Sequence, residues 1–198
     1  NVPHDWSIEG PYDRANPTAR GGGYLPAGIG WYRKTFEINK ADANKLTSVE
    51  FDGIMANSDV WINGKHLGKR PYGYISMSYD LTPYLNFGKP NVIAVRADNT
   101  IQPASRYYTG AGIYRHVRLV SVSPTHFKHW GTFITTPTAT PAKGVVNLKV
   151  EVENNGTAGD YKLQIDIIDN KGKVVKTVES QKNIAAKTIG VMIKEFGS

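Results

Sequence analysis

Hydrophobic and polar residues alternate along many short stretches of this chain, and turn-forming residues separate the stretches. The alternation is clearest in residues 31–38 (WYRKTFEI), 145–152 (VVNLKVEV) and 161–168 (YKLQIDII). A period of two places successive side chains on opposite faces of a β-strand, whereas an amphipathic helix repeats about every 3.6 residues. Because no long stretch follows the helical period, the pattern predicts an all-β protein.

Further strands of the same kind are predicted at residues 48–53, 58–62, 65–68, 75–81, 91–97, 114–120 and 174–178. Asn63-Gly64 predicts a tight hairpin, because both residues tolerate the positive φ that a type I′ turn needs. Trp31 and Trp61 lie inside alternating strands, so we expect them in the core. Tyr24 and Tyr107 lie in loops and are expected to be exposed. Many short antiparallel strands with long loops on one side are typical of a jelly roll or a related sandwich.

The composition changes after about Pro124, where aromatic residues thin out and Thr, Val, Ile and Lys become common. We therefore expect two domains. Residues 1–122 should form a jelly-roll (galactose-binding-like) β-sandwich, and residues 123–198 an immunoglobulin-like β-sandwich without a disulfide. A short linker is expected near residues 121–128. The second sandwich is expected to be incomplete at its C-terminal end, with residues 191–193 continuing its ladder.

Composition and charge narrow the classes of function. The chain has 198 residues, 40% of them hydrophobic and 11% aromatic, which is ample for a packed core. The absence of cysteine excludes disulfides and thiolate metal sites. The formal net charge is +7, but the 24 Lys and Arg residues are dispersed and no nucleic-acid-binding motif accompanies them. No stretch approaches the length of a membrane span. Neither nucleic acid nor a membrane is therefore expected as a partner.

Candidate catalytic chemistry is sparse in this sequence. The 17 acidic residues are spread over strands and turns, and no pair is marked out for glycoside hydrolysis, so no catalytic residue is expected. His126 and His129 lack the further ligands that a tetrahedral metal site needs, so no metal site is expected either. No Gly-x-Ser-x-Gly occurs to mark a serine nucleophile. Asp98 ends a strand just before a long loop, where binding groups usually lie, and is retained as a candidate.

Seven segments follow one another between residues 2 and 122: VPHDWSIEG (2–10), GYLP (23–26), GWYRKTF (30–36), FDG (51–53), VWING (60–64), GKRPYGY (68–74) and SRYYTGAGIYR (105–115). Together they resemble the sugar-binding domain of family 2 glycoside hydrolases. The Pro-His-Asp-Trp opening and the Gly-Tyr-Leu-Pro loop are more similar to β-galactosidases than to β-glucuronidases or β-mannosidases. The later part of the chain is similar to the immunoglobulin-like second domain of that family.

This resemblance implies a non-catalytic front end of an enzyme. In the family, two glutamates in a following (β/α)₈ barrel hydrolyse the glycoside by a retaining mechanism, and this chain has no room for such a barrel. The chain would then be a scaffold and the edge of the substrate pocket. The resemblance implies that Asp98, Arg106 and Tyr24 bind the β-galactoside from one rim that faces the barrel. It implies no cofactor, and a structural cation in the intact enzyme stays open.

The partners implied are the carbohydrate substrate and the protein's own catalytic barrel, with a homo-oligomer left open. A periplasmic or extracellular location is expected. Three alternatives remain: a stand-alone carbohydrate-binding module, the same region of a β-glucuronidase or β-mannosidase, and a structural or adhesion pair of sandwiches. Asp98 and Arg106 could equally form an ordinary surface ion pair, worth about 1 kcal/mol at most.

Overall fold

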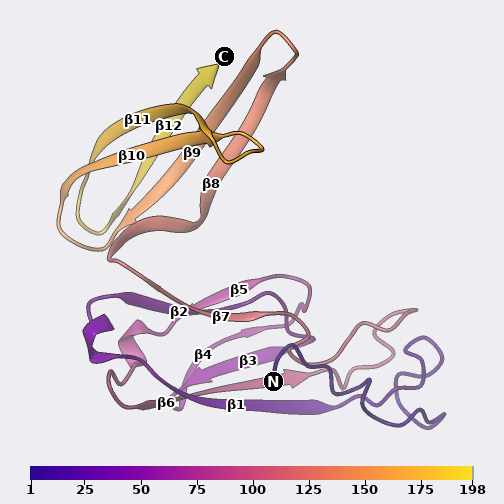
Figure 1. Ribbon diagram of the computed structural model, residues 1–198. Helices are drawn as coiled ribbons and strands as arrows, with labels where there is room; N and C mark the ends of the chain where they lie inside the picture. The colour runs from indigo at the N-terminus through magenta and orange to yellow at the C-terminus, as the bar shows by residue number, and fades with distance from the viewer. Residues whose placement is uncertain (198) are drawn as a thin grey trace. The chain divides into compact units, whose positions relative to one another are not determined.

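The computed structural model describes residues 1–197 and confirms the all-β prediction (Figure 1). The strands are β1 (Ile29–Glu37), β2 (Leu46–Phe51), β3 (Ser58–Ile62), β4 (Lys65–Arg70), β5 (Met77–Asp80), β6 (Pro90–Asp98), β7 (Val117–Val122), β8 (Thr125–Ala139), β9 (Gly144–Asn154), β10 (Gly159–Ile168), β11 (Val174–Ile184) and β12 (Thr188–Gly197). In this described range the helices are two three-residue 3₁₀ turns, η1 (Lys40–Asp42) and η2 (Thr82–Tyr84), and neither could cross a membrane.

The chain divides into two compact units, residues 1–121 and residues 122–198. The first unit is a sandwich of two sheets, with strand orders β1-β6-β3-β4 and β5-β2-β7. In the larger sheet β6 pairs antiparallel with both β1 and β3, and β3 pairs antiparallel with β4. Asn63 and Gly64 close the β3–β4 hairpin with φ values of 49° and 82°, as the type I′ turn requires.

The core of the first unit lies between its two sheets. Its fully buried members are Val49, Phe51, Ile54, Val60, Ile62, Met77, Leu81, Val95, Ala97 and Ile113. Val60 and Ile62 of β3 are two residues apart, as are Val95 and Ala97 of β6, because alternate side chains of a strand face the same way. Full burial of such a side chain stabilises the fold by about 1.5–3 kcal/mol, which fixes the register of each strand.

The prediction that Trp31 and Trp61 belong to this core is wrong. The Trp31 side chain is 63% exposed and Trp61 is half-buried. Tyr32 packs against the core instead, and Ile62 is fully buried. Since neighbouring residues of a strand point to opposite faces, these two inward residues place both indoles on the outer face of the larger sheet.

The second unit also consists of two sheets, a three-stranded one ordered β12-β9-β8 and a two-stranded one of β10 and β11. Its core comprises Leu148, Val150, Val152, Leu163, Ile184 and Met192. Residues 191–193 pair with β9, which confirms that they continue the ladder.

A buried amide, that of Asn154 at the end of β9, ties the two sheets of the second unit together. Its Oδ1 accepts hydrogen bonds from Thr125 Oγ1 at 2.7 Å and from Gly156 N at 3.0 Å. Its Nδ2 donates to the carbonyl oxygens of Thr157 at 2.8 Å and of Ile184 at 3.1 Å. The buried side chain therefore keeps its donors and acceptor satisfied, as a buried polar group must to avoid destabilising the fold.

The connection between the units falls within the expected range 121–128 but is shorter, because β8 already begins at Thr125. Only Ser123 and Pro124 separate it from β7. The pairing of β8 with β9 shifts register twice, and Trp130 adopts a left-handed φ of 55° within the first shift. These irregularities interrupt the alternation by which a strand is recognised in a sequence.

Candidate functional site

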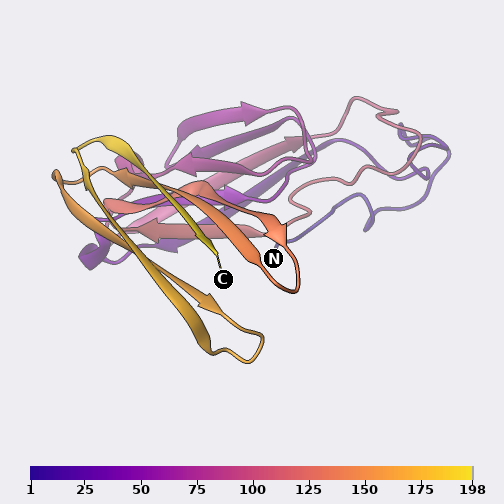
Figure 2. The same cartoon turned by 90° about the horizontal axis from the view of Figure 1, so that it is seen from above.

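Two long loops, residues 1–28 and residues 99–116, lie together at one end of the first unit in both views (Figure 1, Figure 2). Their bases are joined where Gly28 N donates to Asn99 Oδ1 at 2.8 Å and Asn99 N donates to Gly28 O at 3.0 Å. A second link forms where His4 N donates to Ile113 O at 2.8 Å. We call this paired-loop region the loop rim.

The carboxylate of Asp5 holds the loop rim together. The hydroxyl of Tyr108 lies 2.6 and 2.7 Å from its two oxygens, and the N–H of Ala111 donates to Oδ2 at 3.0 Å. The N–H of Ser7 donates to Oδ1, also at 3.0 Å. Burial, followed by the hydrogen bond and charge of Asp5, raises the pKa of Tyr108 far above the usual range of a phenol. Tyr108 therefore stays a hydrogen-bond donor at neutral pH.

Gly30 and Gly112 leave the space in which Trp6 packs beneath the loop rim. A Cβ atom at Gly30 would lie 2.4 Å from the Trp6 ring, and one at Gly112 would lie 2.0 Å from the hydroxyl of Tyr32. Gly112 also has a φ of +79°, in the left-handed region that favours glycine. Both positions need glycine because neighbouring side chains occupy the space that a Cβ would fill.

Phenol rings gather on the same end of the unit. Tyr72, Tyr74 and Tyr114 form a series of edge-to-face contacts, with ring centroids 5.6 and 6.3 Å apart. The Tyr74 hydroxyl donates to Thr109 O at 3.1 Å, which anchors the series to the second loop. Tyr72 is 59% exposed and Tyr107, as expected from its loop position, 63%. Exposed phenols with hydrogen-bonding hydroxyls suit contact with a polar ligand that also has an apolar face.

Asp98 pairs with Arg96 rather than with Arg106. Its Oδ2 accepts from Arg96 Nη2 at 2.7 Å, and its Oδ1 accepts from Thr100 Oγ1 at 2.6 Å and from Thr100 N at 3.0 Å. The hydroxyl of Thr100 is the chief cause that lowers the pKa of Asp98, followed among the lowering causes by its N–H and by Arg96. Asp98 thus stays ionised and fixes the start of the 99–116 loop.

Arg106 and Tyr24 lie on loops that contact each other. A Cβ at Gly21 would lie 2.8 Å from Ser105 O and 3.6 Å from Arg106 Cα, so the first loop runs directly against the second at this point. Arg106 is exposed, and within residues 1–197 it makes no hydrogen bond or ion pair. Tyr24, expected to be exposed, is half-buried with a left-handed φ of 57°. Of the three candidates, the loop rim therefore includes Arg106 and Tyr24, and Asp98 stands at its base.

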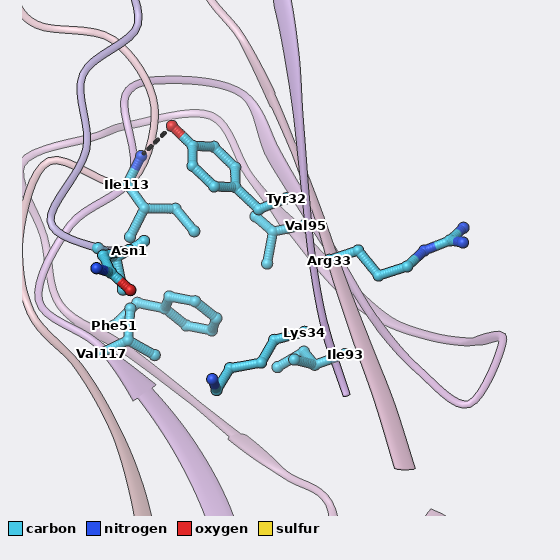
Figure 3. A pocket seen from close by; sticks show the side chains of 10 residues that line it. Asn1, Tyr32, Arg33, Lys34, Phe51, Ile93, Val95, Ile113 and Val117 are labelled. Carbon is cyan, nitrogen blue, oxygen red and sulfur yellow. Dashed lines mark hydrogen bonds between the residues drawn. The ribbon is translucent and has the colours of Figure 1, made fainter. Parts of the chain in front are cut away.

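A hollow of about 440 Å³ opens between the two sheets of the first unit, and Asn1, Val2 and Ile113 of the loop rim line part of it (Figure 3). Its wall includes the apolar side chains of Phe51, Ile93, Val95, Ile113 and Val117, while the side chain of Arg33 points away from it. None of its described lining residues carries a carboxylate, so the hollow does not offer the acid pair of a glycosidase. Among residues 1–197 no group of three or more His, Asp or Glu side chains is placed to hold a metal ion.

Comparisons with known proteins agree with this architecture. The model of the family described as "Glycosyl hydrolases family 2, sugar binding domain" matches residues 14–123. The chain is 53% identical over 160 residues to the β-galactosidase BoGH2A of Bacteroides ovatus, an alignment that covers 81% of this chain and 19% of that protein. It is 46% identical over 194 residues to a putative β-glucuronidase of Formosa agariphila, covering 98% of this chain and 18% of that protein.

A solved structure supports the same relationship. The crystal structure of a glycosyl hydrolase family 2 member from Bacteroides cellulosilyticus superposes on the whole of this chain with a TM-score of 0.95 and 38% identity, and the match covers 26% of that chain. The chain thus spans about a fifth of the length of the two curated relatives and about a quarter of the solved one.

Proposed function

Because this chain belongs to glycosyl hydrolase family 2, through the sugar binding domain at residues 14–123, we propose that it is the non-catalytic part of a β-galactosidase. In this proposal the complete protein hydrolyses terminal β-galactosides by a retaining mechanism, with both catalytic carboxylates outside this chain. The chain supplies the scaffold and the edge of the substrate pocket. Its partners are its own catalytic barrel and the carbohydrate substrate.

The observation that carries the proposal is the loop rim. Asp5 holds two loops from distant parts of the sequence as one layer, and the layer presents Arg106 and Tyr107 to solvent. A planar guanidinium can donate to sugar hydroxyls through its fork of N–H groups. We propose that Arg106 and Tyr24 contact the terminal sugar, and that Asp98 contributes by fixing the loop that carries Arg106.

A β-glucuronidase is the second candidate. The similarity to the Formosa agariphila protein supports it, since that alignment covers nearly the whole chain, whereas the higher identity to BoGH2A favours the galactosidase. The two substrates differ at C6, which is a carboxylate in the glucuronide and a hydroxymethyl group in the galactoside, and in the configuration of the C4 hydroxyl. An exposed cation such as Arg106 could serve either sugar.

The deciding experiment compares nitrophenyl-β-galactoside with nitrophenyl-β-glucuronide as substrates of the complete protein. We expect kcat/KM to favour the galactoside by about a hundredfold or more, because a site built for one polar substituent rejects another strongly. The 198-residue chain alone, assayed in parallel, should release no nitrophenol above the buffer rate. Preference for the glucuronide would establish the second candidate, and turnover by the chain alone would overturn the non-catalytic assignment.

A further inference from the structure

The outer face of the β1-β6-β3-β4 sheet carries two stacked indoles. The rings of Trp31 and Trp61 have centroids 5.3 Å apart and planes inclined by 29°. Trp31 remains 63% exposed in this arrangement. One face of each indole is thus turned toward the other ring, and Trp31 still offers a large aromatic surface to solvent, although it contributes little to the buried core.

The strand register explains why the two rings meet. Trp31 is opposite Arg96 on β6, and Trp61 is opposite Ala94 on the same strand. β1 and β3 flank β6, so the two indoles reach each other across β6, and the small side chain of Ala94 leaves room for them. The platform formed by Trp31 and Trp61 is therefore set by backbone pairing, and it needs no ligand to form.

A chain of hydrogen-bonding groups borders this platform. Arg96 lies 2.7 Å from Asp98 and 3.6 Å from Asp59, and Asp59 in turn lies 2.9 Å from His66 Nε2. The imidazole of His66 lies against Trp61, with ring centroids 5.1 Å apart. The side chains of Asp59, Arg96 and Asp98 are between 15% and 24% exposed, so each can still meet a ligand.

The centre of the face carries charges of both signs. Arg96 is engaged by Asp59 and Asp98, so these three side chains carry one excess negative charge. The cations Arg33 and Lys69 flank them, because Arg33 is opposite Ala94 and Lys69 is opposite Asp59. A ligand above the indoles would therefore meet donors, acceptors and charges of both signs. A neutral polyhydroxylated ligand can use the donors and acceptors alike, whereas the carboxylates of Asp59 and Asp98 repel an anion.

We propose that this face is a second carbohydrate-binding site, which holds a neutral oligosaccharide by stacking a pyranose ring on the Trp31–Trp61 platform. A pyranose has an apolar face of C–H groups and a rim of hydroxyls. The exposed Trp31 ring covers the apolar face and Trp61 supports it from behind, while Asp59, Arg96 and His66 exchange hydrogen bonds with the hydroxyls. The site lies on the outer face of the larger sheet and uses other residues than the loop rim. The inference therefore goes beyond the proposed hydrolysis and does not depend on which glycoside the complete protein hydrolyses.

The test measures binding to the complete protein by calorimetry. The probe is a sulfur-linked β-galactotetraose, a neutral oligosaccharide whose linkage resists hydrolysis. We expect wild-type protein to bind at a site that Trp31→Ala weakens by about tenfold or more, the loss expected for one stacked aromatic contact. Hydrolysis of nitrophenyl-β-galactoside should stay unchanged in this variant. Trp31→Tyr, which keeps a flat ring, should retain most of the binding and shows whether loss in Trp31→Ala reflects the ring.

Trp130→Ala is the matched control, because Trp130 is 71% exposed but belongs to the second unit. It should leave binding of the tetraose unchanged. Equal binding by wild type and Trp31→Ala would overturn the proposal, and so would a preference for an acidic oligosaccharide at this site. If the wild-type protein did not hydrolyse the galactoside, that result would count against the proposed function and not against this second site.

Discussion

Asp5 and Tyr108 are 103 positions apart in the chain, yet the Tyr108 hydroxyl lies within 2.7 Å of both carboxylate oxygens of Asp5. The same carboxylate accepts from the backbone N–H groups of Ser7 and Ala111. One side chain therefore determines how the 1–28 and 99–116 loops meet. The first two predictions concern this pair.

Tyr108→Phe should lower the free energy of unfolding of the first unit by about 1–2 kcal/mol. A hydrogen bond to a charged group contributes about 1.5–3 kcal/mol, and partial exposure of this pair reduces that value. Urea unfolding followed by circular dichroism measures the change. Tyr107→Phe is the control, because Tyr107 is exposed on the same loop and should have little effect. A loss of equal size in both variants would contradict a specific role for the Asp5–Tyr108 pair.

The stability difference between wild type and Tyr108→Phe should shrink at high pH. The pKa of Tyr108 is raised in the folded protein, so its contribution is fully present below the ordinary phenol pKa of about 10. Above that pH the unfolded chain loses the proton while the folded protein must keep it, which favours unfolding by up to about 1.4 kcal/mol per pH unit. Unfolding of both proteins at pH 9, 10 and 11 measures the trend. A difference that is constant over this range would refute it.

Arg106→Ala in the complete enzyme should lower kcat/KM for a β-galactoside by about tenfold or more, the effect expected when a substrate-orienting contact is removed. Asp98→Ala should act in the same direction, because it releases Thr100 and the loop that follows. Lys187→Ala in the second unit is the control. If Arg106→Ala and Asp98→Ala both kept wild-type kinetics, only a structural role for Arg106 and Asp98 would remain.

The second unit should exchange its amide hydrogens faster than the first, from about Gly144 onward. Within the described residues its core has six fully buried hydrophobic side chains, against ten in the first unit, and one of its sheets has only two strands. Fewer buried apolar contacts allow local opening at a lower free energy. Mass-spectrometric hydrogen exchange on the monomer measures the rates. Uniformly slow exchange across both units would show that the smaller core protects its amide hydrogens as well as the larger core does.

The positions of most strands could be predicted, because the alternation of side chains follows from backbone geometry. Which face of a strand points into the core could not be predicted where both faces carry a mixture of apolar and polar residues. In β1, Trp31 shares its face with Arg33, while Tyr32 shares its face with Lys34. Hydrophobicity alone therefore favoured burying Trp31. The packing of Tyr32 beneath the loop rim determines which face of β1 points inward. That packing joins residues that are distant in the sequence.

The candidate site was predictable in part. The sequence predicts loops at Arg106 and Tyr24, and both residues lie on loops in the structure, while their contact with a sugar stays a prediction. The partner of Asp98 was missed, although residues two apart on a strand share a face and Arg96 satisfies that rule. Asp5 lies in the segment VPHDWSIEG, and nothing in its neighbours marks it as the residue that joins the two loops. Its partners Tyr108 and Ala111 lie more than a hundred residues away, and no local pattern reveals such a contact.

The position of Asp5 also decides where a useful recombinant piece of this protein can begin. The family match starts at residue 14, so a piece cut at that boundary would keep all seven strands of the first sandwich and lose Asp5. Tyr108 and the Ala111 N–H would then have no carboxylate to bind, although the sheets could still pack. Such a piece would also lose Trp6, which packs against the core, so it would understate the stability of the sandwich and misrepresent the loop rim.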